Sequence, residues 1–336
     1  KNDEWAAFEA VTNHPGEKIL TNLSGSYVRD AYLQGLTLQD QGKPNPFNFG
    51  VIGSSDTHVG GGSYTEETHF SKIGILDGEP YLRGSVPFDG IYGFIAKLWQ
   101  PDSILEIDEK NYLSFSPRLI RFGSSGLAGV WAEENTRESI YNAFRRKETF
   151  GTSGPRIKVR FFAGYNFENS DLNDRDLIQE AYSKNIPMGG DIIQEKGKNP
   201  RFLVWAISDP LGAPLQRVQI IKGWLADGEQ REKVFDVACS DGQSVNPLNH
   251  RCPDNGAKVN LDDCSISREK GNAEIKTFWQ DPEFSNDQEA FYYARVLENP
   301  TCRWSTWDAV RAEEKPRSDI PVTIQERAWS SPIWIK

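Results

Sequence analysis

The sequence has no excess of basic residues and no long apolar run. Its 336 residues include 38 Lys and Arg against 48 Asp and Glu, a formal net charge of −10 at pH 7. A protein that binds nucleic-acid phosphates needs a basic face, so we expect no nucleic-acid partner. No apolar stretch approaches the ~20 residues of a membrane helix, so we expect no membrane span. The residues after Lys1 carry no signal-peptide pattern, which indicates a processed product or a piece of something longer.

Cysteine is scarce, and all four residues lie in the C-terminal third: Cys239, Cys252, Cys264 and Cys302. None forms a CxxC pair, so a structural zinc site is unsupported. An even number of cysteines in one loop-rich region predicts two disulfides, with three possible connectivities. We favour Cys252–Cys264 and Cys239–Cys302, and therefore a periplasmic or extracellular location, where disulfides persist. The alternative is four buried free thiols in a cytosolic protein.

The first part of the chain alternates helix and strand signals. Residues 26–38 place apolar residues at near-helical spacing, and a break at 42–46 precedes a short apolar strand expected at 49–53. Polar residues 54–58 follow directly. Together these form one repeat of an α/β protein, a class in which the carboxyl ends of strands carry the chemistry. Residues 59–130 are Gly-rich and too long for a plain connector, so we expect a functional loop or insertion there.

A helix is predicted at 137–147, capped by Thr136. From Arg156 the pattern becomes β, and this change sets a domain boundary near 151–155. Short alternating strands are expected at 157–161, 202–207, 217–221, 234–237 and 291–297. Such strands, separated by Gly, Pro, Asp and Asn, are typical of an antiparallel β-sandwich. At ~150 residues per domain, the length allows two domains. The predicted fold is therefore α/β plus β, with an α/β domain at 1–155 and a sandwich-like, disulfide-bearing domain at 156–336.

Histidine is also rare, and one of the four lies in the sequence Asp56-Thr57-His58, directly after the apolar strand. On an extended strand, residues i and i+2 point to the same side, so Asp56 and His58 can share one metal ion. A carboxylate oxygen with an imidazole nitrogen suits Zn, Mn or Fe better than Ca. The alternative is an Asp that caps a turn beside a surface histidine.

Two further residues are candidates for chemistry. His69, in the Gly-rich stretch, can line the mouth of a pocket or act as a general acid, although an exposed histidine without a role is commoner. Arg156 follows the Gly154-Pro155 turn and is our candidate for an anion contact that neutralises developing negative charge. Its alternative is an ordinary first residue of a strand that faces solvent. We interpret His14 and His250 as non-catalytic.

Residues 53–58 (GSSDTH), preceded by Asn45-Pro46-Phe47 and followed by a Gly-rich loop, resemble the last metal-binding motif of the polymerase and histidinol phosphatase (PHP) superfamily. More narrowly, the chain resembles the domain-of-unknown-function family 3604. The stretches that carry this narrower resemblance are 26–31, 53–58, 129–137, 154–157, 298–305 and 325–334.

The resemblance implies a partial PHP-type distorted α/β barrel with a C-terminal β-rich appendage. It also implies two or three divalent metal ions at the ends of the strands, with Asp56 and His58 matching the superfamily's late ligands. The early His-x-His motif and the middle His and Glu ligands do not occur in this sequence. The chain therefore resembles the C-terminal portion of a longer member, whose N-terminal half holds those ligands.

The expected function follows from these ions. A multinuclear metal site lowers the pKa of bound water and clamps both the attacking and the leaving oxygen. We expect a metal-dependent hydrolase that acts on a small-molecule phosphoester, or on a sulfate or carboxyl ester, with the missing N-terminal half of the same protein as its partner. The alternative, from a different class, is a non-catalytic ligand- or protein-binding module in which the β-rich domain dominates.

Overall fold

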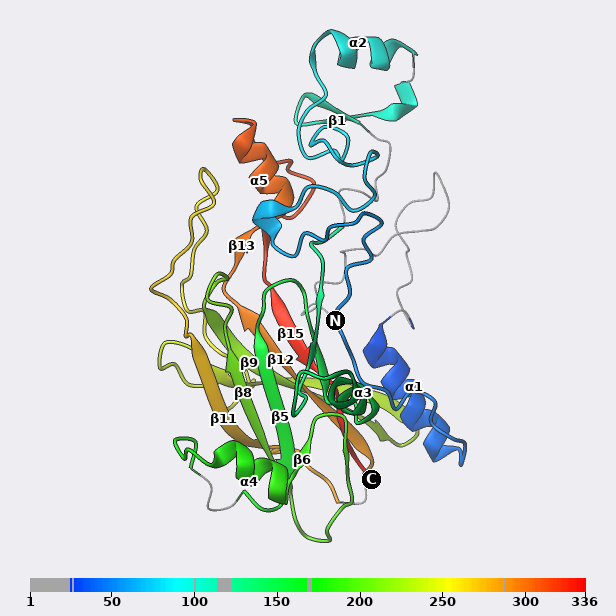
Figure 1. The fold of residues 1–336 in the computed structure, drawn as a ribbon, viewed down its shortest axis with the longest axis vertical. Helices are drawn as coiled ribbons and strands as arrows, with labels where there is room; N and C mark the ends of the chain where they lie inside the picture. Colours follow the sequence, from blue (N-terminus) through cyan, green and yellow to red (C-terminus); the bar gives the residue numbers. More distant parts are fainter. Residues whose placement is uncertain (1–24, 26, 100, 114–121, 168–170, 287) are drawn as a thin grey trace.

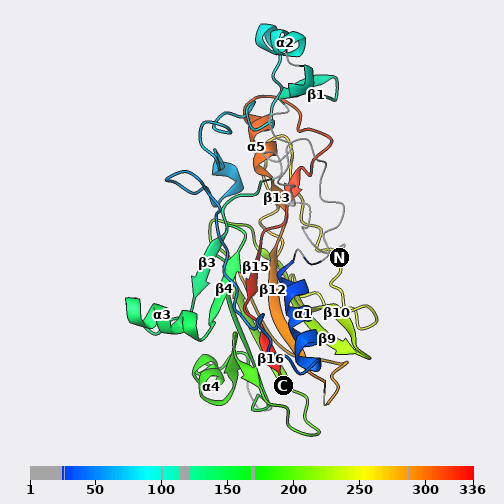
Figure 2. The same cartoon turned by 90° about the vertical axis from the view of Figure 1, so that its right-hand side faces the viewer.

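The computed structural model describes residues 25, 27–99, 101–113, 122–167, 171–286 and 288–336. The molecule is elongated (Figures 1 and 2). Its larger end is built from two β-sheets. The smaller end carries α2 (Gly90–Trp99) above a hairpin of β1 (Ile104–Ile107) and β2 (Lys110–Leu113). The Gly-rich stretch of the sequence thus contains regular elements of its own.

The larger sheet has the strand order β10-β9-β12-β15-β4-β3, all antiparallel, with β16 beside β12 and β7 parallel to β16. Its strands are β3 (Leu127–Val130), β4 (Thr149–Thr152), β7 (Asp191–Ile192), β9 (Leu215–Ala226), β10 (Glu229–Cys239), β12 (Ala290–Glu298), β15 (Arg327–Ser330) and β16 (Ile333–Ile335). The second sheet is antiparallel, in the order β11-β8-β5-β6. Its strands are β5 (Lys158–Gly164), β6 (Ile186–Pro187), β8 (Arg201–Ile207) and β11 (Glu274–Gln280). A separate pair joins β13 (Thr301–Cys302) to β14 (Thr323–Ile324).

The two sheets enclose one apolar core. Val159 and Phe161 on β5 are fully buried, as are Tyr292, Ala294 and Val296 on β12, and all five belong to the same cluster. Every second residue of β5, β8 and β12 faces this core, which is the period-2 alternation seen in the sequence. Burial of each large apolar side chain stabilises the fold by about 1.5–3 kcal/mol. The predicted strands of the C-terminal part are therefore confirmed, as is a mixed α/β protein with antiparallel sheets.

The structure does not bear out the strand and the barrel expected in the N-terminal part. Residues 49–53 form no strand, so that prediction is wrong, and the described residues contain no closed barrel. The strands β3 and β4 precede residue 155, yet they belong to the larger sheet. The domain boundary near 151–155 stays a prediction.

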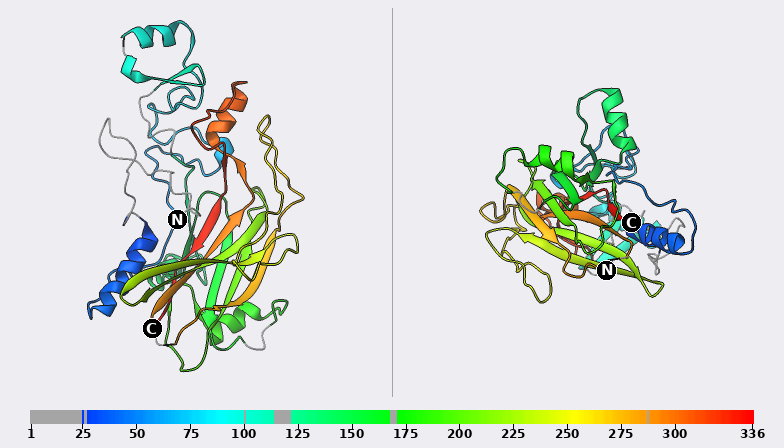
Figure 3. Two further views of the ribbon diagram at one scale, coloured as in Figure 1. Left: turned by 180° about the vertical axis from the view of Figure 1, so that it is seen from behind. Right: turned by 90° about the horizontal axis from the view of Figure 1, so that it is seen from below.

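The predicted helices are present. α1 (Val28–Asp40) lies across β9 and β10 of the larger sheet (Figure 3), and its Tyr32 and Leu36 pack in a second apolar cluster with Phe291. α3 (Arg137–Arg145) begins after Thr136, whose Oγ1 accepts the Ser139 N–H at 3.2 Å, as the cap predicts. The remaining helices are α4 (Leu177–Lys184), α5 (Trp304–Arg311) and the 3₁₀ turns η1 (Glu66–Thr68) and η2 (Pro101–Ser103).

The outer face of α2 is apolar and exposed. Its Gly93 packs so closely on the preceding turn that an ideal Cβ would lie 1.9 Å from the Phe88 carbonyl oxygen. On the other side Tyr92 and Phe94 are exposed, and Trp99 is 82% exposed. No helix in the described part of the chain is long and apolar enough to cross a membrane, and α2 itself has 10 residues.

Two disulfides are present, as predicted, but the favoured pairing is wrong. The bonds are Cys239–Cys252 and Cys264–Cys302. After β10 the chain turns back on itself, and the His250 carbonyl accepts the Asp236 N–H at 2.9 Å. This reversal returns Cys252 to the end of β10, beside Cys239. Cys264 is then left to anchor the long loop to Cys302 on β13.

Replacing Cys264 and Cys302 together by alanine should lower the free energy of unfolding by about 4 kcal/mol, and replacing Cys239 and Cys252 by about 3 kcal/mol. The sequence separations are 38 and 13 residues, and a longer loop restricts the unfolded chain more. Urea unfolding of the two double variants without reductant measures both losses. The opposite order of stability would contradict this prediction.

Candidate functional site

Residues 50–54, which lead to the Asp–His motif, lie against the outer face of β3 and β4 (Figure 2). An ideal Cβ on Gly53 would lie 2.4 Å from the Leu127 carbonyl oxygen and 2.6 Å from that of Thr152. Only glycine allows this approach. Gly126 donates its N–H to the Ser54 carbonyl at 3.0 Å. The backbone therefore crosses the sheet instead of extending it, which is why the apolar run at 49–53 is not a strand.

Asp56 and His58 are exposed, and they lie in irregular backbone and not in an extended strand. Asp56 has a φ of +47°, in the left-handed region, so the geometry assumed from the i, i+2 spacing does not apply. His58 Nδ1 lies 3.0 Å from the Asp56 carbonyl oxygen. Because a carbonyl oxygen only accepts, the neutral imidazole carries its proton on Nδ1 and keeps the lone pair on Nε2. This is the arrangement in which metal-binding histidines are held.

Metal binding requires several donor side chains that converge on one ion. In the part of the protein that the structure describes, no group of three or more His, Cys, Asp or Glu side chains is arranged to hold an ion. Asp56 and His58 supply one carboxylate oxygen and one imidazole nitrogen, a donor set of the right chemistry for Zn, Mn or Fe. A zinc ion takes four ligands, so a complete site needs donors beyond this pair.

Arg156 is exposed and packs beside the loop that follows His58. The backbone N–H of Arg156 donates to the Asp209 carboxylate at 2.7 Å. Its guanidinium carbon lies 5.4 Å from the centre of the Tyr64 ring. Gly154 has a φ of +153°, and a Cβ there would lie 2.5 Å from the Tyr64 carbonyl oxygen, so the turn requires glycine. The turn thus fixes Arg156 against Tyr64, in the loop that follows His58.

His69 is buried, with 6% of its surface exposed, so the expectation of an exposed side chain is wrong. Its ring stacks on Trp304 with centroids 4.7 Å apart. Burial, helped by the positive charge of Arg83, lowers the pKa of His69 to about 4. The imidazole is therefore neutral at pH 7, which gives no support to its role as a general acid. Of the other histidines, His14 lies outside the described residues and His250 packs on Phe235.

Sequence reasoning missed three buried glutamates, Glu66, Glu298 and Glu326, which we call the buried glutamate cluster. Glu66 accepts the N–H groups of Ser124 at 3.0 Å and Trp304 at 2.7 Å. Burial is the largest cause that raises the pKa of all three carboxyl groups, and the pKa of Glu298 reaches about 8. The cluster joins segments far apart in the chain. Nothing in the local sequence distinguishes these glutamates from exposed ones.

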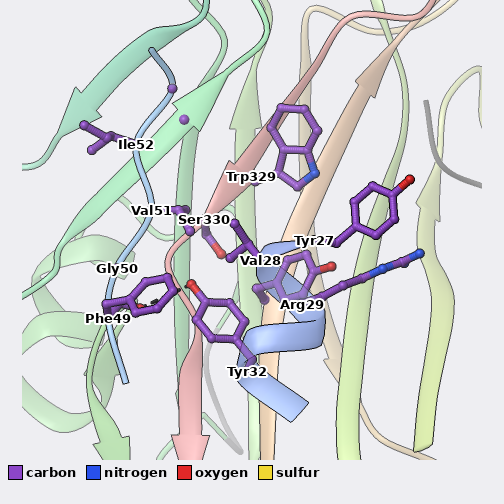
Figure 4. A pocket seen from close by; sticks show the side chains of 13 residues that line it. Tyr27, Val28, Arg29, Tyr32, Phe49, Gly50, Val51, Ile52, Trp329 and Ser330 are labelled. Atoms are coloured by element: carbon purple, nitrogen blue, oxygen red, sulfur yellow. Dashed lines mark hydrogen bonds between the residues drawn. The ribbon is translucent and has the colours of Figure 1, made fainter. Parts of the chain in front are cut away.

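A pocket of about 490 Å³ opens between α1, residues 49–53 and the outer face of the larger sheet (Figure 4). The aromatic side chains that line it are Tyr27, Tyr32, Phe49, Tyr293 and Trp329, and we call it the aromatic pocket. Arg29 is the one charged residue in its described lining, and its guanidinium pairs with Glu232 at 2.9 Å. These residues come from separate parts of the chain, so only the fold reveals them.

Fold and site together define a mixed α/β protein with two packed, mostly antiparallel sheets. It carries an exposed Asp–His pair just after residues 50–54, which cross the larger sheet. Over residues 1–336 the chain matches the family described as protein of unknown function (DUF3604), and it belongs to that family. The family expected from the sequence motifs is thereby confirmed. No curated protein matches the chain.

Proposed function

We propose that this chain is part of a metal-dependent hydrolase of the PHP type, which cleaves a phosphoester or related ester of a small molecule. The proposal depends chiefly on the 3.0 Å contact between His58 Nδ1 and the Asp56 carbonyl oxygen. This contact orients the imidazole and reserves Nε2 for a ligand bond. Asp56 adds an exposed carboxylate two residues away.

The donor atoms of Asp56 and His58, a carboxylate oxygen and an imidazole nitrogen, suit a divalent Zn, Mn or Fe ion. The pair supplies only part of the coordination. In this proposal the remaining ligands, and the rest of a PHP-type barrel, belong to an N-terminal half of a longer protein. A bound divalent ion would activate water and stabilise the charge that develops on the ester. Asp56 and His58 would hold that ion, and the Asp56 carbonyl would keep the imidazole in place.

Arg156 has a matching role in this proposal. The net charge of −10 repels an anionic substrate at long range, so local groups must attract it. Arg156 is exposed and is held by its contact with Tyr64, six residues after His58, and it would bind the anionic oxygens of the ester. The two disulfides support action in the periplasm or outside the cell, where such bonds persist.

Calorimetric titration of the chain with Mn²⁺ or Zn²⁺ tests this proposal. Asp56→Ala should weaken metal binding at least 10-fold. Asp227→Ala is the matched control, because Asp227 is also exposed and has a φ of +53°. In the complete protein, Asp56→Ala should abolish hydrolysis of para-nitrophenyl phosphate or sulfate, and Asp227→Ala should not. Equal metal affinity and activity in both variants would refute the proposal.

A second function, a non-catalytic ligand-binding module, is favoured by the aromatic pocket, which needs no metal to bind an apolar molecule. The two functions differ in the titration. Ligand binding in the pocket, together with metal affinity that does not depend on Asp56, would support the binding module over the hydrolase.

A further inference from the structure

We infer that the aromatic pocket binds the ring of an aryl ester whose ester group lies at Asp56 and His58. The inference rests on the proposed function and adds to it the class of substrate: phosphate or related esters of aromatic alcohols. It also assigns a binding role to Tyr27, Tyr293 and Trp329, which have no place in the metal chemistry.

The pocket has the volume of a small-molecule site, and the elements that line it are held together by direct contacts. Its volume of about 490 Å³ falls in the usual range for such sites. Tyr32 on α1 donates its hydroxyl hydrogen to the Phe49 carbonyl oxygen at 3.2 Å, and the two rings lie 5.1 Å apart. Tyr32 also packs edge-on against Trp334, with ring centroids 5.7 Å apart. These contacts fix α1 and residues 49–53 to each other and to the sheet.

The chemistry of the lining selects an uncharged ring. Among the described residues that line the pocket, none is Asp, Glu, Asn or Gln, the residues that a sugar would need as partners. The charge of Arg29 is balanced by Glu232. Aromatic side chains favour another ring, which they contact edge-to-face or in offset stacks. Figure 4 shows Tyr27 and Trp329 on one side of the cavity and Phe49 and Ile52 on the other.

The pocket and the Asp–His motif share one segment of backbone. Gly53 lines the pocket, and Asp56 is three residues further on. Three residues span at most about 11 Å, so the Asp56 Cα lies no further than that from the Gly53 Cα, and an aryl ester with its ring in the pocket has to bridge this distance. Ser331 Oγ accepts the Val51 N–H at 2.9 Å, and the Gly126 N–H donates to the Ser54 carbonyl oxygen at 3.0 Å. The wall of the pocket and the backbone up to Ser54, two residues before Asp56, are therefore held on the same sheet.

Binding of 2-naphthol to the chain, measured by calorimetry, tests the pocket without any metal. Val28→Trp should fill the pocket from α1 and weaken binding at least 10-fold. Leu211→Trp adds the same side chain at an exposed position outside the pocket and should leave binding unchanged. If Val28→Trp does not fold, Ile52→Trp fills the pocket from the opposite wall. No binding of 2-naphthol, or equal binding by the filled and control variants, would overturn the inference.

The link to the metal site is tested with 2-naphthylphosphonate, which has no ester bond to hydrolyse. Mn²⁺ should tighten the binding of 2-naphthylphosphonate at least 10-fold and leave the binding of 2-naphthol unchanged. Asp56→Ala should abolish the Mn²⁺-dependent gain without changing the binding of 2-naphthol. If Mn²⁺ binds at Asp56 but gives no gain, the inference fails while the proposed function stands. If Asp56→Ala does not change Mn²⁺ binding, the proposed function fails and takes the link with it, and the 2-naphthol titration still decides whether the pocket binds rings.

Discussion

Replacing Arg83 by methionine should lower the free energy of unfolding by about 3–5 kcal/mol, because the change leaves a buried carboxylate without its partner. Arg83 and Asp308 are both buried, and Nε and Nη2 of Arg83 each donate to an Asp308 oxygen at 2.7 Å. Without the guanidinium, Asp308 keeps the Ser85 hydroxyl, at 2.5 Å, as a donor. One neutral hydrogen bond does not offset the cost of burying the charge.

Urea unfolding at pH 7 measures this loss. Lys97→Met is the matched control, because Lys97 pairs with Glu106 at 3.0 Å on the surface. An exposed pair contributes about 1 kcal/mol at most, so the control should lose little. The double change Arg83→Met with Asp308→Leu should recover part of the stability, since no charge then stays buried alone. A loss below about 1 kcal/mol in Arg83→Met would contradict the prediction.

Glu298→Gln should make the stability of the protein much less dependent on pH between 5 and 9. Burial raises the pKa of Glu298 to about 8 in the folded protein, whereas a glutamate in an unfolded chain has a pKa of about 4.3. As the pH rises between these values, the unfolded state releases its proton first, and the folded state loses relative stability. At about 1.4 kcal/mol per pKa unit, the loss reaches about 5 kcal/mol at pH 9.

Denaturant unfolding at pH 5 and pH 9 checks this prediction. At pH 5 the glutamine side chain of the variant replaces a carboxyl group that is mostly protonated in the folded protein, so the variant and the parent should differ little. At pH 9 the variant should be more stable by several kcal/mol. Glu67→Gln is the matched control, because Glu67 is exposed. Its free energy of unfolding should equal that of the parent at both pH values. Parallel pH profiles for the parent and Glu298→Gln would rule the prediction out.

The sequence predicts an element correctly where the contacts that form it join residues close together in the chain. The cap of α3 depends on Thr136 and Ser139, three residues apart, so the start of that helix could be located from sequence. The strands of the two sheets show their alternation directly. Residues 49–53 have the composition of a buried strand, but Gly53 allows a close approach to Leu127 and Thr152, far along the chain. No local pattern contains that contact.

The same limit applies to the site. A motif identifies Asp56 and His58, yet it reveals neither the left-handed backbone at Asp56 nor the contact of His58 Nδ1 with the Asp56 carbonyl oxygen. The disulfide pairing depends on the reversal after β10 and not on spacing. The aromatic pocket needs α1, residues 49–53 and two central strands in place at once, so it appears only after the sheet has formed.

The central claim is that His58 presents Nε2 to a metal ion. Long-range ¹H–¹⁵N correlation spectra of the ¹⁵N-histidine-labelled chain at pH 7.5 test it most directly, with His58→Gln to assign the signal. We predict that the neutral His58 ring carries its proton on Nδ1 and that Zn²⁺ shifts the Nε2 resonance, with a weaker response in Asp56→Ala. A proton on Nε2, and a signal that does not move at saturating Zn²⁺, would contradict the account.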